Sequence, residues 1–134
     1  MKIDGGCHCG NVTFTAEIDP EKVTACHCTD CQNLTGSPYR VVVQAPKETF
    51  RLSGGKVKSY VKKTAESGTP RVQAFCPECG TPIYSTGLSD QKIFGLRLGT
   101  IRQRAQLKPK KQIWCRSALA WARLGDVPQV EKQA

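Results

Sequence analysis

The sequence contains no long hydrophobic run and no apolar leader. No stretch approaches the roughly 18 apolar residues of a membrane-spanning helix, and the opening MKIDGG lacks the apolar core of a secretory signal peptide. We therefore expect a cytoplasmic protein without a membrane anchor. Internal repeats, low-complexity tracts and flexible linkers are also lacking, so the 134 residues fit one ordinary domain. We place this domain at residues 1–124.

Helical periodicity is scarce, and short alternating runs predominate. In NVTFTAE, the side chains of Val12, Phe14 and Ala16 would share one face of a strand. Similar β-type runs, separated by turns that contain Gly or Pro, are YRVVVQA, TFRL, KVKSYV, RVQAF and KIFGLRL. This pattern predicts an all-β sandwich, barrel or folded-over sheet.

One short segment near the C-terminus has helical character. SALAWARL, residues 117–124, predicts a short C-terminal helix or turn, which could begin at a Ser117 cap and extend for at most about two turns. The residues expected to pack inward are Leu119, Trp121, Ala122 and Leu124. Residues 125–134 contain little that could be buried, so we expect a frayed tail there.

Acidic residues are missing from much of the second half of the chain. Arg97–Arg123 carries eight basic side chains and no acidic one, and the formal net charge of the chain is +9. Such a field attracts anions, which include nucleic acid, membrane headgroups and small carboxylates. Nucleic acid is not favoured, because the aromatic residues in this stretch, Trp114 and Trp121, are both expected in the core.

Cysteine, by contrast, is abundant and grouped. The eight cysteines form C-x-C at 7 and 9, C-x-C-x-x-C at 26, 28 and 31, and C-x-x-C at 76 and 79, with Cys115 alone. Disulfides are rare in a reducing cytoplasm, so tight groups favour metal ligation or thiol chemistry over a disulfide framework. A disulfide framework is the alternative for an extracellular protein whose leader had been removed.

The spacing within the groups is typical of zinc ligands. In FCPECG, a C-x-x-C turn directs two sulfurs at one point, and Gly80 permits the tight turn that brings backbone N–H groups to the thiolates. In an extended C-x-C, both cysteine side chains lie on one face of the strand, where they can grip one ion. His8 and His27 would then point away, which favours a surface or outer role over ligation.

The seven grouped cysteines divide naturally into four and three. A structural zinc takes four protein ligands, whereas a reactive zinc takes three and leaves one position open. Two pairings remain possible from the residues alone. Cys28 and Cys31 could join the 76/79 pair as a zinc ribbon, or the 7/9 pair could do so and leave CHCTDC as a compact three-thiolate site.

Two closed zinc sites are a further alternative, because Cys115 or a histidine could supply an eighth ligand. Cys115 lies beside Trp114 in QIWCRS and is more simply interpreted as a small buried residue in a strand. The open three-thiolate site is therefore preferred.

The motifs GGCHCGNVTF, CHCTDCQNLTG, KTAESG, FCPECGTPIY and IWCRSALAW together resemble the glutathione-dependent formaldehyde-activating enzyme family, which includes centromere-protein-V-like domains. The resemblance covers about residues 5–121. It implies an Mss4-like β-tent of small antiparallel sheets that holds two zinc ions per chain. It also implies that the structural zinc ligands are Cys7, Cys9, Cys76 and Cys79, and that the reactive zinc ligands are Cys26, Cys28 and Cys31.

The activity that the resemblance implies is that of a carbon–sulfur lyase of the S-(hydroxymethyl)glutathione synthase type. Its reactants would be a small glutathione-like thiol and a small aldehyde such as formaldehyde. A thiol held as thiolate at an open zinc position suits this chemistry. His27 and Thr81 lie beside ligands in the sequence and could orient water or a ligand sulfur. The turn at residues 36–38 could form one rim of the site.

Two other functions fit part of the pattern. A non-catalytic module with two zincs could dock nucleic acid or another anionic partner through its basic half. A redox sensor could release metal when exposed zinc thiolates oxidise. No segment for a regulated partner is visible in the sequence, so the sensor ranks last.

Overall fold

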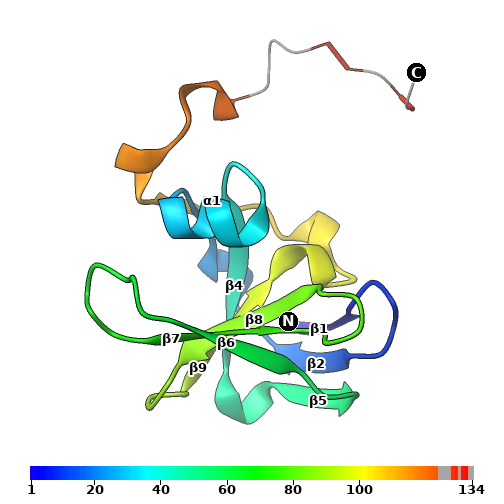
Figure 1. The fold of residues 1–134 in the computed structure, drawn as a ribbon. Helices are drawn as coiled ribbons and strands as arrows, with labels where there is room; N and C mark the ends of the chain where they lie inside the picture. Colours follow the sequence, from blue (N-terminus) through cyan, green and yellow to red (C-terminus); the bar gives the residue numbers. More distant parts are fainter. Residues whose placement is uncertain (124–127, 130, 133–134) are drawn as a thin grey trace.

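The structure is a computed structural model that describes residues 1–123, 128–129 and 131–132. In this part of the chain it is mostly β, with one α-helix and several short 3-10 turns (Figure 1). The expected single domain over residues 1–124 remains a prediction. The expectation of a frayed tail over residues 125–134 falls largely outside the described residues.

Two sheets make up the fold. The first has the order β1-β2-β5 and is antiparallel. Its strands are Lys2–Gly6, Thr13–Glu17 and Arg51–Gly54. The second has the order β10-β3-β4-β9-β8-β7-β6 and is antiparallel except for the parallel β10–β3 pair. Its strands in that order are Lys111–Ile113, Val23–Cys26, Arg40–Pro46, Ile93–Arg97, Pro82–Gly87, Arg71–Phe75 and Lys58–Lys62.

The helices are short. The α-helix α1 is Thr29–Thr35, and it lies with the segment after β10 at one end of the molecule (Figure 1). The amide of Gln32 joins these two parts, because its Nε2 donates to the carbonyl oxygen of Ser117 at 3.0 Å. The 3-10 turns η1 to η6 are Pro20–Lys22, Lys47–Thr49, Leu98–Thr100, Arg104–Gln106, Cys115–Ser117 and Ala120–Ala122.

The core lies between the two sheets. Alternation in β2 buries Phe14 and Ala16, and the adjoining Val12 is also buried, as the sequence predicts. The facing strands β4 and β9 contribute Val43, Ala45, Phe94 and Leu96 to the same cluster. Burial of each large apolar side chain contributes about 1.5–3 kcal/mol, so this alternation determines which face of each sheet points inward.

The predicted strands are confirmed near all six apolar runs, but four strands were not predicted. β1, β3, β8 and β10 were missed. β3 lies in the sequence VTAC and has three of its four residues buried, so it shows no alternation between apolar and polar positions. The mostly β fold is confirmed, whereas the Mss4-like tent remains a prediction.

Of the helix or turn predicted near the C-terminus, the turn is confirmed, whereas one continuous helix from Ser117 is not formed. The structure has two separate 3-10 turns there, η5 and η6. Ala118 and Leu119 between them are extended, with φ −61° and ψ 137° at Ala118, so the segment presents no continuous helical face. Trp114 and Trp121 are 41% and 59% exposed, so their assignment to the core is also wrong. Leu124 lies outside the described residues.

The α-helix within the second cysteine motif was not predicted. Its N-cap is Cys28, whose Sγ accepts the N–H of Cys31 at 3.2 Å, and it ends at Gly36, which has φ +63°. A cysteine is not among the residues that usually signal a helix start, and a seven-residue helix carries little periodicity.

Cys115 was expected in a buried strand. It is exposed and lies in η5, because β10 ends two residues earlier.

Candidate functional site

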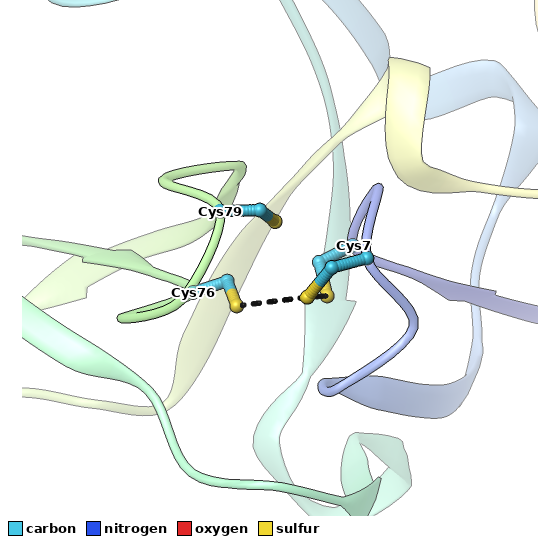
Figure 2. Close-up of side chains that lie close together, drawn as sticks. Cys7, Cys76 and Cys79 are labelled. Carbon is cyan, nitrogen blue, oxygen red and sulfur yellow. Dashed lines mark hydrogen bonds between the residues drawn. The ribbon is translucent and has the colours of Figure 1, made fainter.

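The first cysteine cluster joins two turns that lie far apart in the sequence. One turn connects β1 to β2 and the other connects β7 to β8, and Figure 2 shows their side chains pointing toward one another. The four sulfurs, from Cys7, Cys9, Cys76 and Cys79, all lie within 4.8 Å of one another. Of the two pairings that the sequence left possible, the structure brings together the 7/9 pair and the 76/79 pair.

Backbone groups hold the sulfurs of this four-cysteine cluster in place. The N–H of Val12 donates to Cys7 Sγ at 3.2 Å, and the N–H of Glu78 donates to Cys76 Sγ at 3.4 Å. Gly80 adopts φ +77° and closes the β7–β8 turn, as expected from FCPECG. The C-x-C at Cys7 forms a turn, because Gly10 N–H bonds back to the Cys7 carbonyl; the extended form expected there is wrong.

Thr81 belongs to the surroundings of the four-cysteine cluster. Its Oγ1 lies 3.1 Å from Cys79 Sγ and accepts the backbone N–H of His8, also at 3.1 Å. The hydrogen bond from this hydroxyl is the main reason that the pKa of the Cys79 thiol falls to about 5. The predicted role of Thr81 at the reactive site remains a prediction.

The second cluster lies where β3 ends and α1 begins. The sulfurs of Cys26, Cys28 and Cys31 lie within 4.8 Å of one another, with 2.9 Å from Cys28 to Cys31 and 3.3 Å from Cys31 to Cys26. Cys26 and Cys31 are buried, whereas Cys28 is partly exposed. One sulfur of this three-cysteine cluster therefore faces outward and two face the protein.

The environment of the cluster favours a thiolate. Cys31 donates its thiol hydrogen to Cys26, which lowers the pKa of Cys26 to about 5 and raises that of Cys31. The positive charge of Arg40 also lowers the pKa of Cys26 and partly offsets the rise in the pKa of Cys31. A thiolate is the form that binds metal and attacks electrophiles.

Cys28 opens onto a pocket of about 290 Å³. Its walls come from the start of α1, from the loop after β6 and from η5, and include Lys62, Thr64, Trp114 and Arg116. Lys62 Nζ lies 3.5 Å from a carboxylate oxygen of Asp30, and the Thr64 hydroxyl donates to the same oxygen at 2.7 Å. No role was predicted for Lys62 or Thr64. The signals for this wall in the sequence were the motif KTAESG, which contains Thr64, and the motif IWCRSALAW, which contains Trp114 and Arg116.

Trp114 has an unusual backbone for its size. It has φ +56° and ψ 38°, and the guanidinium carbon of Arg116 lies 4.9 Å from its ring centroid. A left-handed conformation costs a non-glycine residue roughly 1–2 kcal/mol and often marks a binding site. Here it lies directly after β10, at a residue that lines the Cys28 pocket.

His27 lies between two clustered cysteines but is not part of their cluster. Its Nε2 lies 2.8 Å from Gln112 Oε1, its ring packs on Tyr39 at 5.1 Å between centroids, and 4% of its surface is exposed. It is therefore buried toward β10, and the surface alternative is wrong. Whether it acts on the site remains a prediction. His8 is exposed.

Both clusters suit zinc by the chemistry of their donors. Four sulfurs about a tetrahedral zinc, at roughly 2.3 Å each, would lie about 3.8 Å apart. In the four-cysteine cluster, Cys7 and Cys9 are 3.6 Å apart and Cys9 and Cys76 are 3.8 Å apart. In the three-cysteine cluster the sulfurs lie closer together, at 2.9 Å and 3.3 Å, so they would have to separate by up to about 0.9 Å to reach the tetrahedral zinc spacing. Cys115 belongs to neither cluster.

Comparison with known proteins agrees with these features. A sequence profile described as glutathione-dependent formaldehyde-activating enzyme matches residues 2–117. An uncharacterized lyase of Schizosaccharomyces pombe is 30% identical over 81 residues, which are 60% of this chain and 55% of that protein. A putative glutathione-dependent formaldehyde-activating enzyme of Halomonas elongata is 25% identical over 87 residues, 63% of this chain and 55% of that protein. The matches thus span about half the length of these relatives.

The fold also has a counterpart among solved structures. A crystal structure of a Rhodobacter sphaeroides protein aligns with a TM-score of 0.62 at 19% identity, and the alignment covers 81% of this chain and 98% of that one. This likeness concerns the fold alone. No helix among the described residues has the length and apolar character needed to cross a membrane. Because the profile covers most of its length, the chain belongs to the glutathione-dependent formaldehyde-activating enzyme family.

Proposed function

We propose that the protein is a zinc-dependent carbon–sulfur lyase-type enzyme that forms or cleaves adducts of a small thiol with a small aldehyde. Glutathione and formaldehyde are the reactants that the family name supports. The observation that carries the proposal is the three-cysteine cluster, in which only Cys28 faces a pocket. In the same proposal, the fold is a β-tent with two zinc sites, of which the four-cysteine site is structural.

The two clusters would have different tasks. Cys7, Cys9, Cys76 and Cys79 supply four ligands, which closes a site and ties two turns together. Cys26, Cys28 and Cys31 supply three ligands. Zinc bound there would offer a fourth position, at which a substrate thiol is held as thiolate at neutral pH.

The chemistry requires one new bond and one proton. The thiolate sulfur of the substrate bonds to the aldehyde carbon, the carbonyl π electrons move to oxygen, and that oxygen takes up a proton. The reverse sequence cleaves the carbon–sulfur bond and releases the aldehyde. The chain holds both reactants in one pocket, and this orientation contributes much of the rate.

Lys62 is placed to stabilise the negative charge that develops on the aldehyde oxygen. It lies on the pocket wall with Cys28, and its side chain is 13% exposed. A partly desolvated positive charge stabilises the oxyanion that develops on the aldehyde. Asp30 and Thr64 fix its position, because the carboxylate pairs with Lys62 and receives the Thr64 hydroxyl.

Exchange NMR with glutathione and formaldehyde tests this function. The zinc-loaded protein should accelerate adduct exchange, and Cys28→Ser should abolish the acceleration. Cys115→Ser is the matched control, because Cys115 is exposed and lies outside both clusters. Equal exchange rates for wild type and Cys28→Ser would refute the lyase and favour a metal-binding module without turnover.

A further inference from the structure

Three arginines gather on the face of the large sheet that points away from the core. Arg40 lies in β4, Arg71 in β7 and Arg97 in β9. Arg40 lies directly opposite Cys26 in the β3–β4 ladder, and Arg97 lies opposite Val42. Because opposed residues share a face, with Cβ atoms about 5 Å apart, Arg40 stands beside the three-cysteine cluster.

This arginine cluster, Arg40, Arg71 and Arg97, forms no ion pair with an acidic side chain of the described residues. The acidic residues that do form ion pairs in this part of the chain have other partners, in the pairs Lys62–Asp30, Arg102–Asp4, Lys110–Glu21 and Arg116–Glu66. The partner that Arg97 does have is neutral, since its Nη2 donates to Gln73 Oε1. The cluster therefore retains its full positive charge.

Four nitrogen atoms of two of these guanidinium groups are also buried without a hydrogen-bond partner among the described residues. The Nε and Nη1 atoms of Arg40 and of Arg97 have almost no exposed surface and bond to no described atom. Arg97 as a residue is only 8% exposed. Buried polar atoms are nearly always hydrogen-bonded, so these four donors indicate a ligand that accepts hydrogen bonds.

The positive charges of the three arginines repel one another. Burial and the neighbouring charge of Arg40 lower the pKa of Arg97 to about 9, and the same two causes lower the pKa of Arg71. Such an arrangement is unfavourable unless negative charge is added. Three thiolates that hold a divalent metal carry a formal charge of −1 together, which leaves two of the three arginine charges uncompensated.

Two of the three arginines, Arg40 and Arg97, line a space that can accommodate a ligand. A pocket of about 640 Å³ is lined by Arg40 and Arg97, and also by Thr35, Ser37 and Thr81. Ser37 and Pro38 of the turn at residues 36–38 line this pocket, whereas the expectation that the turn forms one rim of the cysteine site remains a prediction. A planar guanidinium binds a carboxylate through two parallel hydrogen bonds, which makes a carboxylate the ligand that fits best.

We propose that Arg40, Arg71 and Arg97 bind a carboxylate of the thiol substrate, so that the three-cysteine site selects anionic thiols over neutral ones. This inference rests on the proposed function. It extends that function by naming the residues that recognise the substrate and the charge that they require.

Matched thiols test the selection by charge. 3-Mercaptopropionate and its methyl ester carry the same thiol but differ in charge, and titration calorimetry of the zinc-loaded protein gives the affinity for each. The wild-type protein should bind the acid at least about tenfold more tightly, since a hydrogen bond to a charged group contributes roughly that factor. Equal affinities for acid and ester would overturn the proposal.

Arginine variants show whether these residues cause the selection. Arg40→Gln and Arg97→Gln should remove most of the preference for the acid over the ester. Arg51→Gln is the control, because it removes the same charge from the exposed strand β5. Arg71→Gln, at a half-buried position, serves if the other variants do not fold. A preference that survives in every folded variant would contradict the proposal.

The affinities measured by calorimetry do not depend on turnover, because no aldehyde is present in that experiment. Charge selection without adduct exchange would refute the lyase function but retain the arginine site. Adduct exchange without charge selection would support the lyase function and refute the arginine site.

Discussion

The four-cysteine cluster should hold the two sheets together, and Cys76→Ala tests this. Cys76 is fully buried and brings the β7–β8 turn to the β1–β2 turn. Between these turns the structure has one conventional hydrogen bond, from His8 N–H to Thr81, which contributes about 1 kcal/mol. A structural zinc contributes an apparent ~10–16 kcal/mol, which matches or exceeds the stability of a typical domain.

We therefore expect Cys76→Ala to lose one zinc and most of its cooperative thermal unfolding transition. Calorimetry and metal analysis of the purified variant would show both effects. Cys28→Ala is the comparison, because it should lose a zinc from the other cluster and keep the cooperative transition. Cys115→Ala should change neither. If Cys76→Ala melts at the wild-type temperature with one fewer zinc, this cluster does not support the fold.

Three further predictions concern the core, the acid range and the pocket mouth. Phe14→Ala should lower the free energy of unfolding in urea by about 3–5 kcal/mol, because Phe14 is 1% exposed at the centre of the core; a loss under about 1 kcal/mol would contradict that placement. Asp4 has a lowered pKa, chiefly through hydrogen bonds from Arg102, so its stabilisation is present above about pH 4 and disappears as the pH falls through the depressed value. Asp4→Asn should flatten the stability profile in that range, and an unchanged acid profile would be inconsistent with this. Trp114→Gly should weaken glutathione binding while the free energy of unfolding stays within about 1 kcal/mol, since relief of the left-handed strain offsets the greater freedom of glycine; unaltered binding would exclude Trp114 from the site.

The sequence predicted the parts of the fold that depend on local alternation. Phe14 and Ala16 alternate with polar residues, so their strand and its buried face were readable. The helix at Thr29–Thr35 could not be predicted in this way, because a cysteine caps it and seven residues are too few to show a helical periodicity of apolar positions. The C-terminal segment forms no continuous helix, because the extended residues Ala118 and Leu119 separate its two turns, and its short apolar pattern did not reveal this break.

The cysteine clusters were more accessible to sequence reasoning than their surroundings. Spacing alone identified the three cysteine motifs and favoured, without deciding it, a site made of Cys26, Cys28 and Cys31, which the structure brings together. Arg40 and Lys62 lie near the three-cysteine cluster because strands pair across the sheet. The sequence around each residue does not reveal this pairing. Long-range pairing also brings the remaining four cysteines together, and the residues by themselves left that pairing open.

The central claim is that the three-cysteine cluster holds a metal with an open position that a substrate thiol occupies. Cadmium NMR of protein substituted with cadmium tests it, since each site gives its own signal. Two signals are expected, and addition of glutathione should shift only the signal that Cys28→Ser removes. A single signal, or two signals that glutathione leaves unchanged, would contradict the claim.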